Sequence, residues 1–362
     1  MKTIMHYVKE NPVRVLLLAI PLVILAELLH WPELVVFALS SVAIIPLAGL
    51  IGESTESLAH YTGPKLGGLL NATLGNAAEL IITIVAIREG LLDLVKASIT
   101  GSIIGNLLLV MGMSMLLGGL KHGTQKFDRR QAGNNAILLV LTVLILVIPS
   151  LLSHNIGHVE PPDPRVEALS LGVAAVMIIL YGLGLFYSFR SDGGPLTPEP
   201  VDAQVVHKAW PLRTALVMLA LSTVGVAGLS EVLVGAVGPV VDALGISEFF
   251  IGVIFIPIIG NVAEHLVAVQ VAVKNQMTLS VEIAVASSLQ IALFVAPALV
   301  FISLLFGHPL TLAFNSIELI VLIAGVLIAV LVSEDGESNW LEGAGLLAMY
   351  IIIGLAFFLL PS

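Results

Sequence analysis

The stretches GNAAE (residues 75–79) and GNVAE (residues 260–264) are nearly the same five residues, 185 positions apart. Each stretch lies inside a strongly apolar run. A charged side chain at the centre of a membrane helix costs about 2.5–3.5 kcal/mol on insertion scales. Because the chain places a glutamate in this setting twice, in matching surroundings, we expect Glu79 and Glu264 to serve one function.

The composition predicts a membrane protein. Of 362 residues, 58% are hydrophobic and 11% are charged, whereas soluble domains carry about 25% charged residues. Apolar stretches of about 20 residues recur along the chain, which indicates an all-α polytopic protein and not a β-barrel with short alternating segments. The chain contains no cysteine, which excludes disulfides and thiolate metal sites. Its net charge of −10 argues against a nucleic-acid partner, and the apolar stretches predict the lipid bilayer as its surroundings.

Eleven apolar segments are long enough to span a bilayer. The Gly63-Pro64 pair precedes the third segment, and further turn residues precede the sixth and the eleventh. The expected spans are 12–30, 33–57, 65–88, 92–119, 131–153, 166–189, 210–239, 248–273, 278–306, 309–332 and 340–360.

The basic residues predict the orientation of these spans. With the N-terminus in the cytoplasm and eleven crossings, the outer side receives three basic residues, Arg88, Lys96 and Arg165. The other 12 of the 15 lysines and arginines fall on the cytoplasmic side. This excess follows the positive-inside rule and supports the odd number of spans.

One polar segment, SDGGPLTPEPVDAQVVH at 191–207, is rich in proline and glycine and is typical of a linker. It predicts an N-terminal transmembrane helix (1–30), a first five-helix repeat (31–190), a cytoplasmic linker (191–207) and a second five-helix repeat (208–362). Because five is odd, two consecutive repeats enter the membrane from opposite sides. Inverted repeats of this kind place their substrate site near the bilayer midplane.

The two pentapeptides supply oxygen ligands. Each asparagine stands three residues before its glutamate, so the two side chains share one helix face. Ca²⁺ takes six to eight oxygens in irregular geometry, and the glycines permit helix breaks that expose backbone carbonyls to a cavity. We therefore expect cation ligands from Glu79, Glu264, Asn76 and Asn261, and helix breaks at Gly75 and Gly260.

The surrounding residues repeat as well. Ser102 follows Glu79 by 23 positions, and Ser287 follows Glu264 by the same number, although serines in membrane helices often serve close packing alone. His265 points about 100° away from Glu264, so it is either a relay or a buried structural histidine. The candidates for the site or a proton path are Ser102, Ser287, Asn106, Gln290 and His265; those for an access path or gate are Glu56 and Glu231. No role is assigned to Glu282, Glu318 or Glu342.

Two carboxylates at one buried place suggest obligatory exchange. Left ionised and empty they repel each other, whereas a divalent cation or protons neutralise both. If only the neutralised states change sides, cation and protons exclude each other and move in opposite directions. A channel fits a single central site less well, and a metal-dependent hydrolase lacks a motif such as His-Glu-x-x-His.

At these residues the sequence resembles the Ca²⁺/H⁺ (cation/proton) exchanger family, CAX, of the cation/Ca²⁺ exchanger superfamily. The resemblance covers both halves of the chain. The segments that carry it are GESTE (52–56), GGLLNATLGNAAELI (67–81), SITGSIIGNLLLVMG (98–112), PIIGNVAEHLVAV (257–269) and SSLQIALFVAP (287–297).

The resemblance implies ten helices in two inverted repeats after an extra N-terminal helix. It also implies a secondary antiporter, not an enzyme, that exchanges Ca²⁺ for H⁺ at Glu79 and Glu264 and needs no cofactor. Val262 stands where alanine is usual, and Ala286 where glycine is usual, which bears on ion selectivity. A Na⁺-coupled Ca²⁺ exchanger, or a proton exchanger for another divalent cation such as Mn²⁺, remains the alternative. The short linker points to a plasma membrane and not to a vacuolar one.

Overall fold

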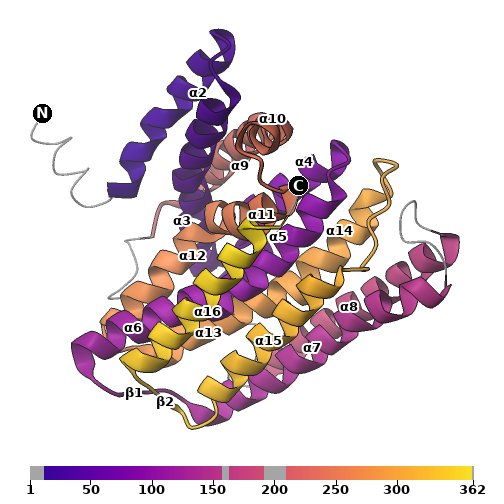
Figure 1. Cartoon of the computed structure of the whole chain (residues 1–362). Helices are drawn as coiled ribbons and strands as arrows, with labels where there is room; N and C mark the ends of the chain where they lie inside the picture. Colours follow the sequence, from indigo (N-terminus) through magenta and orange to yellow (C-terminus); the bar gives the residue numbers. More distant parts are fainter. Residues whose placement is uncertain (1–11, 157–162, 191–208, 361–362) are drawn as a thin grey trace, which may run out of the picture.

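The computed structural model describes residues 12–156, 163–190 and 209–360. The predicted linker at 191–207 lies outside these residues. The structure is almost entirely helical (Figure 1), and among the described residues eight helices are long and apolar enough to cross a membrane. The predicted class, an all-α polytopic membrane protein, is confirmed.

The elements up to residue 190 include a 3₁₀ turn, η1, and a π-helical turn, η2, inside the fourth expected span. In order they are η1 (Pro12–Leu18), α2 (Ala19–Leu28), α3 (Glu33–Leu74), α4 (Ala77–Arg88), α5 (Leu92–Ile104), η2 (Gly105–Val110), α6 (Met111–His122), β1 (Gln125–Lys126), α7 (Arg129–Ile156) and α8 (Pro164–Arg190).

The elements after residue 208 include two further π-helical turns, η3 and η4. In order they are α9 (Leu212–Gly235), α10 (Val237–Leu244), α11 (Glu248–Phe250), η3 (Ile251–Phe255), α12 (Ile256–Val273), α13 (Met277–Gln290), η4 (Ile291–Val295), α14 (Ala296–Ser303), α15 (Ser316–Val332), β2 (Glu337–Ser338) and α16 (Trp340–Phe358).

Two expected boundaries are shifted. Helix α3 joins two helical segments across a break at Gly63, where φ is +80°. The second span therefore runs from Glu33 to Gly63 and not to 57. A positive φ suits glycine, and the following Pro64 disfavours a helical conformation at Gly63, so the break lies where the Gly63-Pro64 pair predicts it, before the third expected span. The tenth span was expected from 309, but α15 begins at Ser316.

Two of the glutamates without an assigned role cap helices. Asn315 accepts a hydrogen bond from the Glu318 backbone N–H (2.9 Å), and Glu318 Oε2 accepts one from the Asn315 N–H (2.7 Å). Asn339 and Glu342 form the same reciprocal pair at the start of α16. Such capping boxes satisfy backbone donors that a helix start leaves free. Glu318 and Glu342 therefore have a structural explanation.

The connecting segments gather on two opposite sides. On one side β1 pairs with β2, and Tyr61 Oη donates a hydrogen bond to the Trp210 carbonyl (3.1 Å). On the other side Arg88 Nη1 bonds Glu231 Oε1 at 2.9 Å. These contacts agree with the alternation of sides predicted for the spans.

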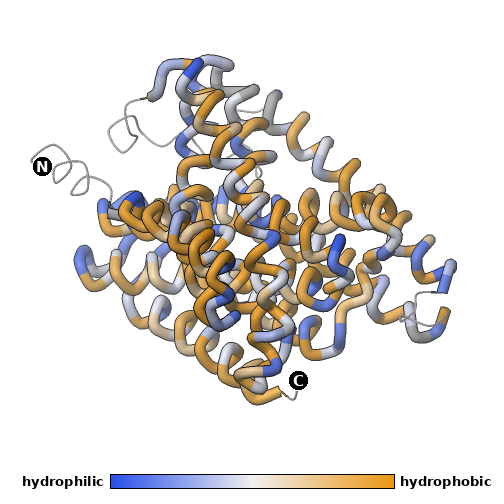
Figure 2. Tube along the Cα trace, turned by 90° about the horizontal axis from the view of Figure 1, so that it is seen from above, coloured by the Kyte–Doolittle hydropathy of each residue, from blue (hydrophilic) through white to orange (hydrophobic). Residues whose placement is uncertain are grey.

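The centre of the molecule contains a tight helix crossing. Helix α5 crosses η3 at Gly101 and Gly252, where apolar side chains are almost all buried. A β-carbon on Gly101 would lie 2.1 Å from the Val253 carbonyl oxygen, and one on Gly252 would lie 2.6 Å from the Ala97 Cβ. Small residues allow backbones in membrane bundles to approach this closely. Apolar residues predominate along the helices, which are mostly orange in the tube of Figure 2, and large apolar side chains such as Val224 and Leu305 are exposed.

Candidate cation site

The two glutamates lie close together because each packs against the glycine of the other motif, where the absence of a side chain leaves room for it. A β-carbon on Gly75 would lie 2.8 Å from Glu264 Oε1, and one on Gly260 would lie 3.2 Å from the Glu79 Cβ. Helices α4 and α12 are in contact along this stretch. Two segments 185 positions apart therefore present their carboxylates to a single site.

Glu79 is completely buried and has three hydrogen-bond donors. Ser102 Oγ donates to Oε1, and Ser98 Oγ approaches the same oxygen at 3.3 Å. Asn261 Nδ2 donates to Oε2 at 3.2 Å and is also 3.4 Å from Ser102 Oγ. These donors come from α5 and from α12, so the second motif helps to fix the carboxylate of the first.

Glu264 is held more loosely. Its Oε2 accepts a hydrogen bond from Ser287 Oγ at 2.8 Å, which matches the Ser102–Glu79 pair 185 positions earlier. The position equivalent to Ser98 is Ile283, which has no hydroxyl to donate. The two carboxylates therefore have unequal numbers of donors.

Each of the two asparagines has a side-chain amide oxygen that accepts no hydrogen bond from the described residues. Asn76 Nδ2 donates to Gln290 Oε1 at 2.9 Å, and Asn261 Nδ2 donates to Glu79 as described. In the part of the chain that the structure describes, neither amide oxygen has a hydrogen-bond partner, although both residues are 1% exposed. A buried polar atom without a partner is costly. Two such oxygens beside two carboxylates are the ligands that a hard cation requires.

Asn106 and His265 contact each other beside this cluster. The distance between Asn106 Oδ1 and His265 Nε2 is 3.1 Å, with the histidine donating in the arrangement described. Asn106 lies in η2, one turn after Ser102. The structure thus brings together all five predicted companions, Ser102, Ser287, Asn106, Gln290 and His265.

The predicted access-path residues lie outside this cluster, and one of the two predicted helix breaks is wrong. Glu56 and Glu231 are exposed at opposite ends of the bundle, and Glu231 pairs with Arg88. The expected helix break at Gly260 is wrong, because α12 runs unbroken from Ile256 to Val273. Gly75 does lie in the short turn between α3 and α4. In the second half the irregular segment is η3, before Gly260, and Gly260 itself serves the close approach to Glu79.

A family model described as "Sodium/calcium exchanger protein" matches residues 32–190 and 214–359, which is most of the chain and includes every residue of the cluster. The chain belongs to the sodium/calcium exchanger protein family. This result confirms the resemblance drawn from the two motifs.

Two bacterial members of this family are highly similar to the chain. A "Ca(2+)/H(+) antiporter" of Aphanothece halophytica is 46% identical, with 96% of each chain covered. The "Ca(2+)/H(+) antiporter ChaA" of Bacillus subtilis is 44% identical over 94% of this chain and 97% of the relative. A solved structure described as native YfkE is 42% identical, has a TM-score of 0.84, and matches 96% of this chain and all of that one.

Within this exchanger fold, two features of the cluster were not predicted. Ser98 was missed, although its place four residues before Ser102 puts both hydroxyls on one helix face. The π-helical turns η2 and η4 were missed too, because no residue type marks them. They follow Ser102 and Ser287 in the two halves, and π-turns in helices occur frequently at functional sites.

In this exchanger, Asn261→Ala is expected to raise the half-saturating Ca²⁺ concentration about tenfold or more. The change removes an unpartnered oxygen and a donor to a buried carboxylate, and such charged hydrogen bonds contribute about 1.5–3 kcal/mol. The measurement is ⁴⁵Ca²⁺ uptake against Ca²⁺ concentration. Gln270→Ala, an exposed amide on the same helix, is the control and should behave as wild type. Unchanged half-saturation in Asn261→Ala would exclude it as a ligand.

Proposed function

We propose that this chain is a secondary active antiporter that exchanges Ca²⁺ for H⁺ across the membrane by alternating access. The observation that carries the proposal is the paired arrangement of Glu79 with Glu264 and of the unpartnered oxygens of Asn76 and Asn261. The names of the bacterial relatives support the same function. Ca²⁺ and H⁺ are the transported substrates, and the protein is a transporter, not an enzyme.

The chemistry of the pair explains the exchange. Two ionised carboxylates in a buried, poorly hydrated place repel each other and lack solvation. One Ca²⁺ offsets both charges, and protons do the same, so Ca²⁺ and protons compete for Glu79 and Glu264. If the empty ionised state cannot change sides, each crossing carries either Ca²⁺ or protons, and the two fluxes are coupled.

The proposed roles follow from the contacts. Glu79 and Glu264 bind the cation or protons in turn, and the amide oxygens of Asn76 and Asn261 add ligands. Ser98, Ser102 and Ser287 orient the carboxylates through their hydroxyls. Glu56 and Glu231, exposed near opposite ends, lie on the access paths. Asn106 and His265 form the wall of the site or a proton path.

We propose the organisation into an N-terminal helix (1–30), two inverted five-helix repeats (31–190 and 208–362) and a cytoplasmic linker (191–207). Matching pairs such as Ser102–Glu79 and Ser287–Glu264 support the repeats. The protein is a multi-pass membrane protein. Its basic residues support an N-terminus in the cytoplasm, and the bacterial relatives support a plasma-membrane location.

The deciding experiment is ⁴⁵Ca²⁺ uptake into proteoliposomes under an imposed gradient. Uptake should increase several-fold when the lumen is more acidic than the bath, since protons leaving the vesicle drive Ca²⁺ inward. A Na⁺ gradient of the same size should give the rate of vesicles without a gradient. Uptake that follows Na⁺ and ignores pH would assign the chain to the sodium-coupled exchangers instead.

A further inference from the structure

Helix α12, which carries Glu264, packs against η2 and α6 from the transport cluster to the end of the bundle where β1 and β2 lie. At the cluster, His265 of α12 contacts Asn106 of η2 at 3.1 Å. At the far end, a β-carbon on Gly118 of α6 would lie 3.2 Å from the carbonyl oxygen of Ala272. His265 and Ala272 are seven residues apart, about two turns, and so share one face of α12. We call the contact between these two points the α6–α12 seam.

A buried hydroxyl lies along this seam. Ser114 shares a face of α6 with Gly118, because residues four apart in a helix lie one above the other. Ser114 is 0% exposed, and its hydroxyl has no hydrogen-bond partner in the part of the chain that the structure describes. Other buried helix serines, such as Ser54 and Ser230, donate at 2.6 Å to the carbonyl oxygen four residues earlier. Ser114 lacks this bond, so its hydroxyl is available to the seam.

The two short strands, at one end of the bundle in Figure 1, turn a polar side chain each toward the interior. Gln125 of β1 pairs with Ser338 of β2, and both are 1% exposed. Because side chains alternate between the two faces of a strand, their neighbours Lys126 and Glu337 lie on the other face, where they form an ion pair at 3.2 Å. Gln125 Oε1 and Ser338 Oγ have no hydrogen-bond partner among the described residues.

The side chain of Gln125 is fixed in position at the outer end of the seam. Its Nε2 donates to the Ala272 carbonyl oxygen at 3.0 Å and to Asn275 Oδ1 at 2.9 Å. Its Oε1 lies against Gly118, where a β-carbon would be 2.1 Å away. The glycine makes room for this oxygen. An unpartnered, buried oxygen is therefore aimed at the face of α6 that also carries Ser114.

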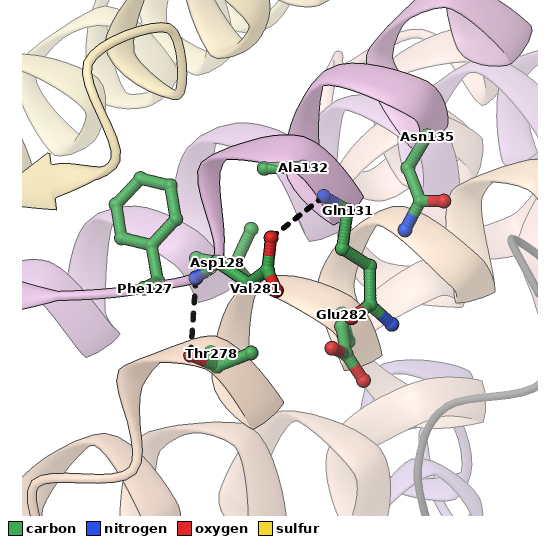
Figure 3. A pocket seen from close by; sticks show the side chains of 8 residues that line it. All are labelled: Phe127, Asp128, Gln131, Ala132, Asn135, Thr278, Val281 and Glu282. Carbon is green, nitrogen blue, oxygen red and sulfur yellow. Dashed lines mark hydrogen bonds between the residues drawn. The ribbon is translucent and has the colours of Figure 1, made fainter. Parts of the chain in front are cut away.

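Helix α13 adds another hydroxyl. Figure 3 shows that Thr278, Val281 and Glu282 line a small pocket beside α7. Ser280 is two residues from both Thr278 and Glu282, a rotation of about 200°, and so lies on the opposite face of the helix. Ser280 is 1% exposed, and its hydroxyl has no hydrogen-bond partner among the residues described. Because α13 also packs against α6 and α12, this hydroxyl faces the seam and not the pocket.

These groups are suited to holding water. Buried polar atoms are normally hydrogen-bonded, and where no protein group serves, an ordered water completes them. At the inner end of the seam, Asn106 Nδ2 also has no partner within the described chain. The packing there is not tight, since a β-carbon on the adjacent Gly105 would meet no neighbouring segment within 4 Å. Waters bonded to hydroxyls form a chain in which each oxygen accepts one proton and releases another onward.

The same groups are poorly suited to Ca²⁺. Asn106, Ser114, Gln125 and Ser338 are all neutral, whereas Ca²⁺ takes six to eight oxygens, usually with carboxylates among them. At the outer end Lys121 Nζ donates to the Val273 carbonyl oxygen at 3.1 Å. Its positive charge repels a divalent cation. The seam therefore favours protons over Ca²⁺.

We propose that the α6–α12 seam is a hydrated proton path, separate from the path of Ca²⁺, that joins the transport site at Asn106 to the side of β1 and β2. The proposed orientation makes that side cytoplasmic. Ser114 and Ser280 carry the path through the bundle, and Gln125 and Ser338 hold water at its outer end. The inference rests on the proposed Ca²⁺/H⁺ exchange and names the route by which protons reach the two glutamates.

The test compares two fluxes of ⁴⁵Ca²⁺ in proteoliposomes that contain the full-length protein. Uptake driven by an acidic lumen requires both the proton path and the Ca²⁺ path. Uptake into vesicles loaded with unlabelled Ca²⁺, at equal pH on both sides, requires the Ca²⁺ path alone. Ser114→Ala and Ser338→Ala should each slow the pH-driven flux about threefold or more, the effect of one lost hydrogen bond. Both should leave Ca²⁺/Ca²⁺ exchange at the wild-type rate, which also establishes that the variants are folded.

Ser222→Ala is the matched control. Ser222 is 1% exposed and its hydroxyl is likewise unpartnered among the described residues, but it lies on α9, which packs against α3 and α4. Both fluxes should be unchanged in this variant. Wild-type pH-driven flux in Ser114→Ala and Ser338→Ala, or an equal loss of both fluxes, would overturn the proton path and leave the proposed function standing. If the wild-type protein exchanges Ca²⁺ for Ca²⁺ and ignores pH, the proposed function itself fails.

Discussion

Replacing either Glu79 or Glu264 with glutamine is expected to reduce Ca²⁺ flux about a hundredfold or more, a loss of about 3 kcal/mol. Glutamine keeps the size of the side chain and can still accept a hydrogen bond from the serine. It carries no charge to attract Ca²⁺ and takes up no proton at neutral pH. Because both acids belong to one site, the remaining glutamate cannot compensate.

The measurement is ⁴⁵Ca²⁺ uptake driven by a pH gradient, with the amount of folded protein matched by size-exclusion chromatography. Glu27→Gln makes the same chemical change at an exposed position of α2 and should transport as wild type. Wild-type flux in Glu79→Gln or in Glu264→Gln would show that the two acids do not share one site.

Gly101→Ala is expected to destabilise the folded protein by several kcal/mol, at or above the about 1–3 kcal/mol typical of overpacking. The added methyl group would lie 2.1 Å from the Val253 carbonyl oxygen. That neighbour is backbone, so no side-chain rotation relieves the contact. Separating α5 from η3 would also move Ser98 and Ser102 away from Asn261. Thermal melting of the detergent-solubilised protein measures the effect.

Gly105→Ala, one turn further along, is the matched control. No atom lies within 4 Å of a β-carbon at Gly105, although the residue is buried. Its melting temperature should equal or slightly exceed that of wild type, since alanine is favoured over glycine in helices. Equal melting temperatures for Gly101→Ala and wild type would show that α5 and η3 are not in close contact in the folded protein.

The helical class and the paired glutamates could be predicted because both depend on features repeated in the sequence. Long apolar stretches determine the spans, and the spacing of 23 between each glutamate and its serine predicts that they meet. The two Ser–Glu hydrogen bonds agree with this spacing. Local chemistry that recurs in both halves is visible without a structure.

Features that occur in one half, or that depend on contact between halves, were harder to predict. Ser98 has no counterpart in the second half. Gly260 looked like a helix break because its motif matches that of Gly75, but a glycine's packing role depends on the neighbour it faces, here Glu79. The capping roles of Glu318 and Glu342 follow from Asn-x-x-Glu at a helix start, a local signal that could have been used.

The packing of each glutamate against the glycine of the other motif limits which substitutions the two glycines tolerate. Gly75 makes room for Glu264, and Gly260 makes room for Glu79. In each half, the glutamate needs the space that the glycine of the other half leaves free. Substitutions in the two halves are therefore coupled. A chimera that joins one half to a half from a relative keeps its ion site when the incoming half retains its glycine as well as its glutamate.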